Sequence, residues 1–193
     1  MKKFIIASLV GAIIIFVWSA LSWMFLPVHT HSMRYTPKQD TILSVLNNSS
    51  LETGVYEIPG VDNRNIGMWK DANYMNEMKD MNKKQEGKPF AMIIYGKGGK
   101  VMNPCQMITG LVIDLLAVMA AVILLAMSKD KLKTFFMRWW AVMLIGFIVA
   151  LNSYLLEWNW MQFPWHFIKG EVVDTFMEWG LCGLWLAWYF RET

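Results

Sequence analysis

The chain has 193 residues, of which 55% are hydrophobic and only 17% charged, below the quarter that is usual in soluble proteins. Its formal net charge of +3 is too small to indicate nucleic acid binding, and its basic residues stand in short groups beside apolar runs. The two cysteines, Cys105 and Cys182, form no CxxC motif, which argues against a zinc ribbon or a thioredoxin-type centre. We expect both to be buried free thiols.

The first apolar run covers residues 4–28 and follows Lys2 and Lys3. It carries no charge, and as a helix it is long enough to cross a hydrocarbon core of about 30 Å. A cleaved signal peptide is the alternative, with Ala20-Leu21-Ser22 as the cleavage site. We favour a retained helix, because large apolar residues continue well past that site.

Three further apolar runs follow, at residues 107–127, 139–156 and 172–189. The last contains two acids, so a helix lying on the membrane surface is its alternative. Its aromatic end favours a membrane span, because aromatic rings collect at membrane interfaces. The predicted fold is an all-α membrane bundle of four transmembrane helices with a small α+β extracytoplasmic insertion between helices 1 and 2. The segments are 1–28, 29–104 for the insertion, and 105–193 for helices 2–4.

Lysine and arginine predict the orientation. The loop "SKDKLKTFFMR" between the second and third runs, the start of the chain and Arg191 all fall on one side of a four-span protein. The positive-inside rule makes that side the cytoplasm. We therefore expect a multi-pass protein of a bacterial inner membrane, with both termini cytoplasmic and residues 29–104 outside.

The insertion has its own local signals. "TPKQDTILSVL" predicts a helix with Thr36 as N-cap, and "DANYMNEMKDMNKKQ" predicts a second helix. Residues 55–58 and 90–95 read as strands, closed by Pro59-Gly60 and by "GKGGK". These elements are too few to form a stable domain without packing on the membrane helices.

Acidic residues gather towards the predicted outer ends of helices 2 to 4. Acids inside a membrane are rare and often functional, so we predict a polar site that faces the bundle interior or a hydrated vestibule. Structural roles are the alternative: solvation of Glu157 and Glu171, capping of helix 4 by Asp174, or a hydrogen bond to Asp114 from Asn152 or Tyr154. The candidate site comprises Asp114, Asn152, Glu157, Asp174 and Glu178.

A second candidate site combines histidine and methionine in the insertion, because imidazole and thioether groups bind Cu(I). "VHTHSM" alternates its ligand residues on one face of an extended chain, and "MNEMKDM" spaces methionines by three on a helix. Such a methionine stripe is more often the packed face of an amphipathic helix, and we favour packing over copper binding. The candidate copper ligands are His29, His31, Met33, Met75, Met78 and Met81.

No HExxH, GxSxG or P-loop motif is present, so no catalytic residues are predicted. The segments "FVWSALSWMFLP", "GVYEIPG" and "NSYLLEWNWMQFP" resemble those of a family of small, uncharacterised bacterial four-helix integral membrane proteins. That resemblance implies the topology and no activity. We expect a non-enzymatic accessory or scaffold protein without a cofactor, which contacts the lipid bilayer and a membrane-protein partner or a second copy of itself. The alternative is a small transporter or copper-handling membrane protein.

Overall fold

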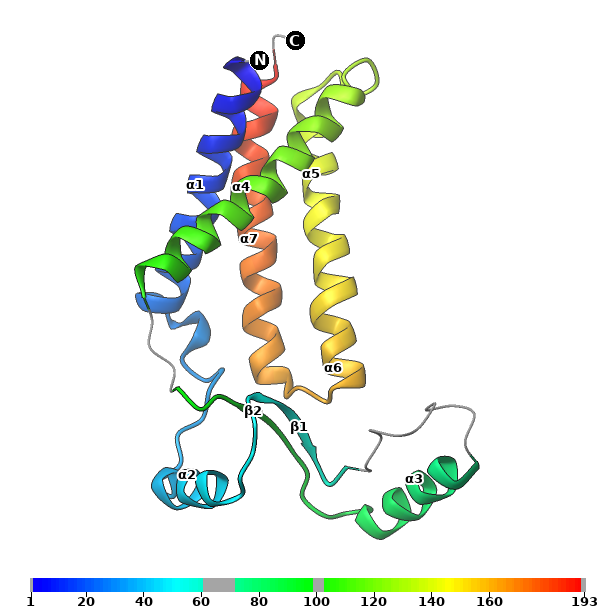
Figure 1. Cartoon of the computed structure of the whole chain (residues 1–193). Coiled ribbons are helices and arrows are strands. Elements are labelled where there is room, and N and C mark those ends of the chain that lie inside the picture. The colour runs from blue at the N-terminus through cyan, green and yellow to red at the C-terminus, as the bar shows by residue number, and fades with distance from the viewer. Residues whose placement is uncertain (1, 61–71, 99–102, 192–193) are drawn as a thin grey trace. The chain divides into compact units, whose positions relative to one another are not determined.

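The computed structural model describes residues 2–60, 72–98 and 103–191. Its contacts divide the chain into two units (Figure 1). The helical unit contains residues 1–35 and 102–193, and the insertion unit contains residues 36–101.

The helical unit is built from long helices with clear start signals. Asn103 and Gln106 form a reciprocal capping box at the start of α4, with Pro104 in the first turn. The Thr134 side chain accepts a hydrogen bond from the Met137 amide at the start of α5. The elements are α1 (Lys2–Met24), the 3-10 turn η1 (Pro27–His29), α4 (Pro104–Met127), α5 (Phe135–Val149), the π-helical turn η2 (Ala150–Leu155), α6 (Leu156–Trp160) and α7 (Trp165–Tyr189).

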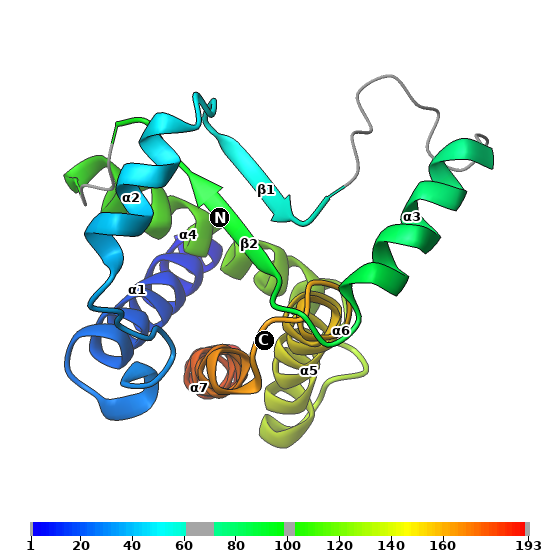
Figure 2. The same cartoon turned by 90° about the horizontal axis from the view of Figure 1, so that it is seen from below.

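Helix α7 is the centre of this unit and packs against both α1 and α5 (Figure 2). Helix α4 completes the core by packing against α1. Gly146 on α5 allows close approach to α7, because a Cβ there would lie 2.8 Å from Cβ of Trp179. The buried core draws on every long helix and includes Ala7, Ile15, Val118, Val122, Val142, Cys182 and Leu186.

Within the described part of the chain, three helical segments are long and apolar enough to cross a membrane, rather than the four predicted. They are Lys2–Met24, Pro104–Met127 and Phe135–Trp160, the last a continuous helical stretch through the π-helical turn. The fourth predicted run lies in α7, which has 25 residues but lower hydropathy. The physical reason is composition, because Lys169, Glu171, Asp174 and Glu178 all lie in this one helix.

The start of α1 lies beside the end of α7. The rings of Phe4 and Phe190 meet edge to face with centroids 5.9 Å apart. The α5 side chain of Arg138 reaches the same place, donating from Nε to the carbonyl oxygen of Ala187 at 3.1 Å. The basic segments that predicted the orientation therefore gather at one end of the helical unit, which we call the basic end.

In the helical unit, one structural alternative and one expectation are wrong. Helix α7 begins at Trp165, after Pro164, so Asp174 lies in its third turn and does not cap it. Both cysteines are free as expected, but Cys105 is exposed at the start of α4 while Cys182 is buried.

The insertion unit contains the predicted two helices and two strands. Strands β1 (Gly54–Ile58) and β2 (Ala91–Tyr95) pair antiparallel, with Val55 opposite Ile94. Helix α2 (Gln39–Asn48) starts later than predicted, and Thr36 is not its N-cap. The other helix is α3 (Ala72–Gln85). No side chain among residues 36–60 and 72–98 is fully buried, as expected for elements that form no core alone.

Candidate functional site

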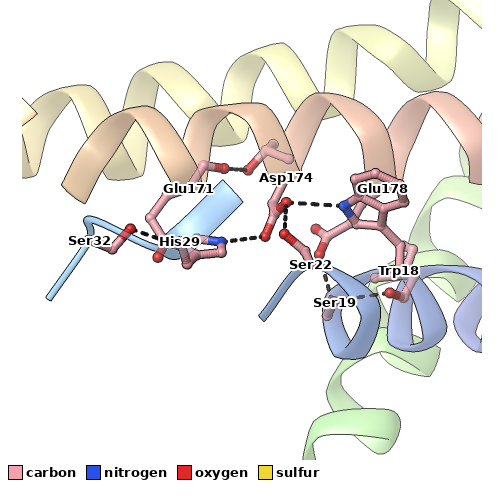
Figure 3. Close-up of polar contacts among 10 residues, drawn as sticks. Trp18, Ser19, Ser22, His29, Ser32, Glu171, Asp174 and Glu178 are labelled. Carbon is pink, nitrogen blue, oxygen red and sulfur yellow. Dashed lines mark hydrogen bonds and ion pairs between the residues drawn. The ribbon is translucent and has the colours of Figure 1, made fainter. Parts of the chain in front are cut away.

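The carboxylate of Asp174 is the centre of a buried polar network between α1 and α7 (Figure 3). Its Oδ1 accepts hydrogen bonds from Trp18 Nε1 at 3.1 Å and from Ser22 Oγ at 2.6 Å. Its Oδ2 lies 2.8 Å from Nε2 of His29. Asp174 is only 5% exposed, and three partners compensate the lost hydration of its carboxylate. We name the set Trp18, Ser19, Ser22, His29, Ser32, Asp174 and Glu178 the α1–α7 network.

Helix geometry places the α1 donors together. Trp18 and Ser22 are four residues apart and therefore lie on one face of α1, the face that packs against α7. Both are side chains with a hydrogen-bond donor inside an otherwise apolar helix. Asp174 then needs only to lie opposite this face to receive both bonds.

The imidazole of His29 is held on three sides. One ring nitrogen contacts Asp174 and the other lies 3.1 Å from Oγ of Ser32, which is also buried. Trp23 stacks on the ring, with centroids 3.8 Å apart and planes 8° apart. Gly170 on α7 makes room, because a Cβ there would lie 2.8 Å from two atoms of the imidazole. The chain that follows α1 is thus fixed against α7.

Glu178 continues the network one turn further along α7. Ser19 Oγ lies 2.6 Å from Oε1 of Glu178 and 3.1 Å from the carbonyl oxygen of Ile15. A serine hydroxyl has one proton, so it can donate fully to only one of these oxygens. Ser19 therefore shares its one proton between the carboxyl oxygen of Glu178 and the carbonyl oxygen of Ile15.

Three of the five predicted acid-site residues lie within electrostatic range of one another, and a fourth is linked to them through Glu171. Glu178 interacts electrostatically with Asp174 and with Asp114 on α4. Glu157 interacts with Glu171, which in turn interacts with Asp174. Asn152 is the exception: its side chain is exposed in the π-helical turn and makes no hydrogen bond to the described part of the chain. It therefore donates nothing to Asp114.

The predicted copper ligands are spread over both units. His29 already has both ring nitrogens hydrogen-bonded, whereas His31 and Met33 are exposed. Met75, Met78 and Met81 are half-buried on α3, in the insertion unit. Among residues 2–60, 72–98 and 103–191, no group of three histidine, cysteine or acidic side chains is arranged to hold a metal ion. Copper binding through the methionines stays a prediction.

An apolar core lies beyond Glu178. The following buried positions on α7 are Trp179, Cys182, Gly183 and Leu186, and they pack against apolar residues of α1, α4 and α5. Within the described chain, the α1–α7 network therefore reaches from η1 to Glu178 and stops there.

Sequence reasoning found the acids and missed their partners. Trp18, Ser19 and Ser22 were hidden in a run that reads as purely apolar, although hydroxyls spaced three apart were a usable signal. His29 was assigned to metal instead of to a carboxylate 145 residues away. Searches of protein-family models, of curated proteins and of solved structures find no match to this chain.

Proposed function

We propose that this is a non-enzymatic accessory protein of a bacterial inner membrane, which binds a partner protein through its insertion unit. In this proposal four helices cross the membrane, both termini are cytoplasmic and the insertion unit is outside. The α1–α7 network then acts as a structural clasp that fixes the chain entering the insertion.

Helix α7 is suited to be the fourth span despite its acids. Its 25 residues correspond to about 37 Å, enough to cross a bilayer. Asp174 is buried and hydrogen-bonded, so it does not face lipid. Polar groups are tolerated in membrane helices when they face the interior of a bundle and are paired there.

The observation that carries the proposed partner binding is the apolar surface of the insertion unit. Cross-strand partners share a face of a sheet, so Val55 and Ile94 lie side by side. They are 66% and 81% exposed, and Met92 on the same face is also exposed. Helix α2 exposes Ile42, Leu43 and Val45 as well. Exposed apolar groups in such number are typical of an interaction surface.

Among the described residues the sheet has two strands, so neither of its outer edges is paired there. Unpaired strand edges are templates for the addition of a partner strand, and the exposed side chains beside them supply specificity. A partner protein that adds a strand to this sheet and covers Val55 and Ile94 would give the insertion unit the core that it lacks.

Transport is the less supported function. A transporter needs a polar path through the bundle, and the α1–α7 network stops at Glu178 above an apolar core. Catalysis by His29 is also disfavoured, since both of its ring nitrogens are engaged within the network.

Site-specific photocrosslinking in the cells that make the protein tests the proposal. A photoreactive residue at Ile94 should give one discrete adduct with a different protein, and the same residue at exposed Lys79 on α3 should not. Adding Val55→Asp should abolish the adduct without lowering the amount of protein in the membrane. An adduct of twice the chain's mass would identify a second copy as the occupant. An adduct with lipid alone, or none, would refute partner binding.

A further inference from the structure

Arg138, in the first turn of α5, is a buried cation at the basic end. It is only 8% exposed. Its Nε donates to the carbonyl oxygen of Ala187, and its Nη1 donates to those of Leu132 and Lys133 at 3.0 and 3.1 Å. These bonds tie the end of α7 to the loop between α4 and α5.

The charge of this guanidinium is not balanced by a carboxylate of the described chain. His29 with Asp174 is the sole ion pair among residues 2–60, 72–98 and 103–191. Buried charges are normally paired, because carbonyl dipoles only partly replace the hydration that is lost. The arrangement therefore leaves room for an anion from outside the chain.

The remaining nitrogen of Arg138 is available to such an anion. Nη2 makes no hydrogen bond to the described residues, whereas every fully buried side-chain nitrogen or oxygen among them has a partner. Nη2 is therefore not fully buried. Arg138 lines a cavity of about 260 Å³ at the basic end, together with Lys129. Phe4, Leu125, Leu132 and Phe190 form its apolar walls.

Two apolar grooves adjoin this cavity, one on each side of α4. The groove between α1 and α4 has a volume of about 160 Å³ and shares Phe4 with the cavity. The groove between α4 and α5 has a volume of about 190 Å³ and shares Leu125 and Leu132 with it. The two cations, Arg138 and Lys129, therefore lie where the two apolar grooves meet the cavity.

We infer that this cavity binds the phosphate of an anionic glycerophospholipid, with one acyl chain in each groove. Nη2 of Arg138 and the ammonium of Lys129 contact the phosphate, which supplies the missing anion. The position fits a phospholipid headgroup, since the cavity lies where α1 begins, α4 ends and α7 ends. The inference requires that the helical unit lies in a bilayer, and it is independent of the partner proposed for the insertion unit.

Native mass spectrometry of the full-length protein, released from detergent with defined lipids, measures this binding. Phosphatidylglycerol should bind at least tenfold more tightly than phosphatidylcholine of the same acyl chains. Lys129→Gln should weaken phosphatidylglycerol binding about fivefold, the effect of one basic residue near a lipid phosphate. Lys131→Gln is the matched control: Lys131 is exposed in the same loop and does not line the cavity, so its loss should change binding less than twofold.

Three results would overturn the inference. Equal affinity for phosphatidylglycerol and phosphatidylcholine would show that binding is due only to the acyl chains in the grooves. Equal effects of Lys129→Gln and Lys131→Gln would show diffuse attraction to the basic surface. Binding of inorganic phosphate at millimolar concentration, without binding of phosphatidylglycerol, would identify a site for a free anion. Arg138→Gln is unsuitable as the main variant, because it also removes three hydrogen bonds that join α5 to its neighbours.

Discussion

Replacing Asp174 by leucine tests whether the α1–α7 network holds α1 against α7. Leucine has a similar size but accepts no hydrogen bond. The donors of Trp18 and Ser22 would then remain in a closed interface without an acceptor, and His29 would lose its carboxylate. Ser22 is fully buried, so water cannot readily replace the lost partner.

The expected loss of unfolding free energy follows from the three contacts. Interhelical hydrogen bonds in membrane proteins average about 0.6 kcal/mol, which gives a lower bound of about 2 kcal/mol. Each buried donor left without an acceptor costs about 1 to 3 kcal/mol, which raises the upper bound to about 9 kcal/mol. Because Ser22 and His29 are both buried, we expect the loss of unfolding free energy to lie above that lower bound, at about 3 kcal/mol or more.

The free energy of unfolding is measured by titrating SDS into mixed micelles and following tryptophan fluorescence. Asp114→Leu is the matched control: it removes a half-buried acid that makes no hydrogen bond within the described chain. We expect it to change stability by less than about 1 kcal/mol, the range of a substitution that leaves no buried donor unpaired. Asp174→Asn should fall between the two, because its side-chain oxygen still accepts from Trp18 and Ser22.

Two outcomes would refute this reasoning. If Asp174→Leu is as stable as the wild type, the network contributes nothing to the fold. If Asp114→Leu is equally harmful, the loss reflects removal of any acid from the bundle and not the specific contacts of Asp174.

Three other predictions test separate features. Gly170→Ala should lower the free energy of unfolding by about 1 to 3 kcal/mol in the same titration, because the new Cβ would displace the imidazole of His29. Gly110→Ala is the control and should be neutral, because a Cβ at Gly110 would have no neighbour within 4 Å. Equal effects of the two substitutions would contradict the close fit of Gly170 around His29. With Cys105→Ser as background, a cysteine at Asn82 should react with an impermeant thiol reagent in whole cells and one at Lys131 should not; the opposite labelling would reverse the topology. The full-length protein with Met75, Met78 and Met81 changed to leucine should keep the Cu(I) affinity of the wild type, if the stripe serves packing; loss of tight stoichiometric binding would establish a copper site.

The apolar helices and the insertion between the first two can be read from the amino-acid sequence. Hydropathy and length suffice for α1 and α4, because an apolar run of more than twenty residues with at most one charge has few alternatives to a membrane helix. The strands of the insertion were found from β-branched and aromatic residues between turn signals. The basic loop between α4 and α5 was also recognisable in the sequence, and its cations do lie at one end of the helical unit.

Helix α7 shows where that reasoning ends. Its first seven residues, from Trp165 to Glu171, read as an aromatic loop, and its acids lower its hydropathy below that of the other long helices. Hydropathy counts each residue equally, regardless of the face on which it lies. Only the packing of α7 between α1 and α5 decided that Asp174 faces inward.

The candidate site divides in the same way. The sequence determined that acids lie near one end of the bundle, because their positions along each helix fix their depth. The folded arrangement was needed to show that Asp174 accepts a hydrogen bond from Trp18, 156 residues away, and contacts His29, 145 residues away. Such pairs depend on how each helix is rotated about its own axis. That rotation follows from close packing of the whole bundle, which no local pattern contains.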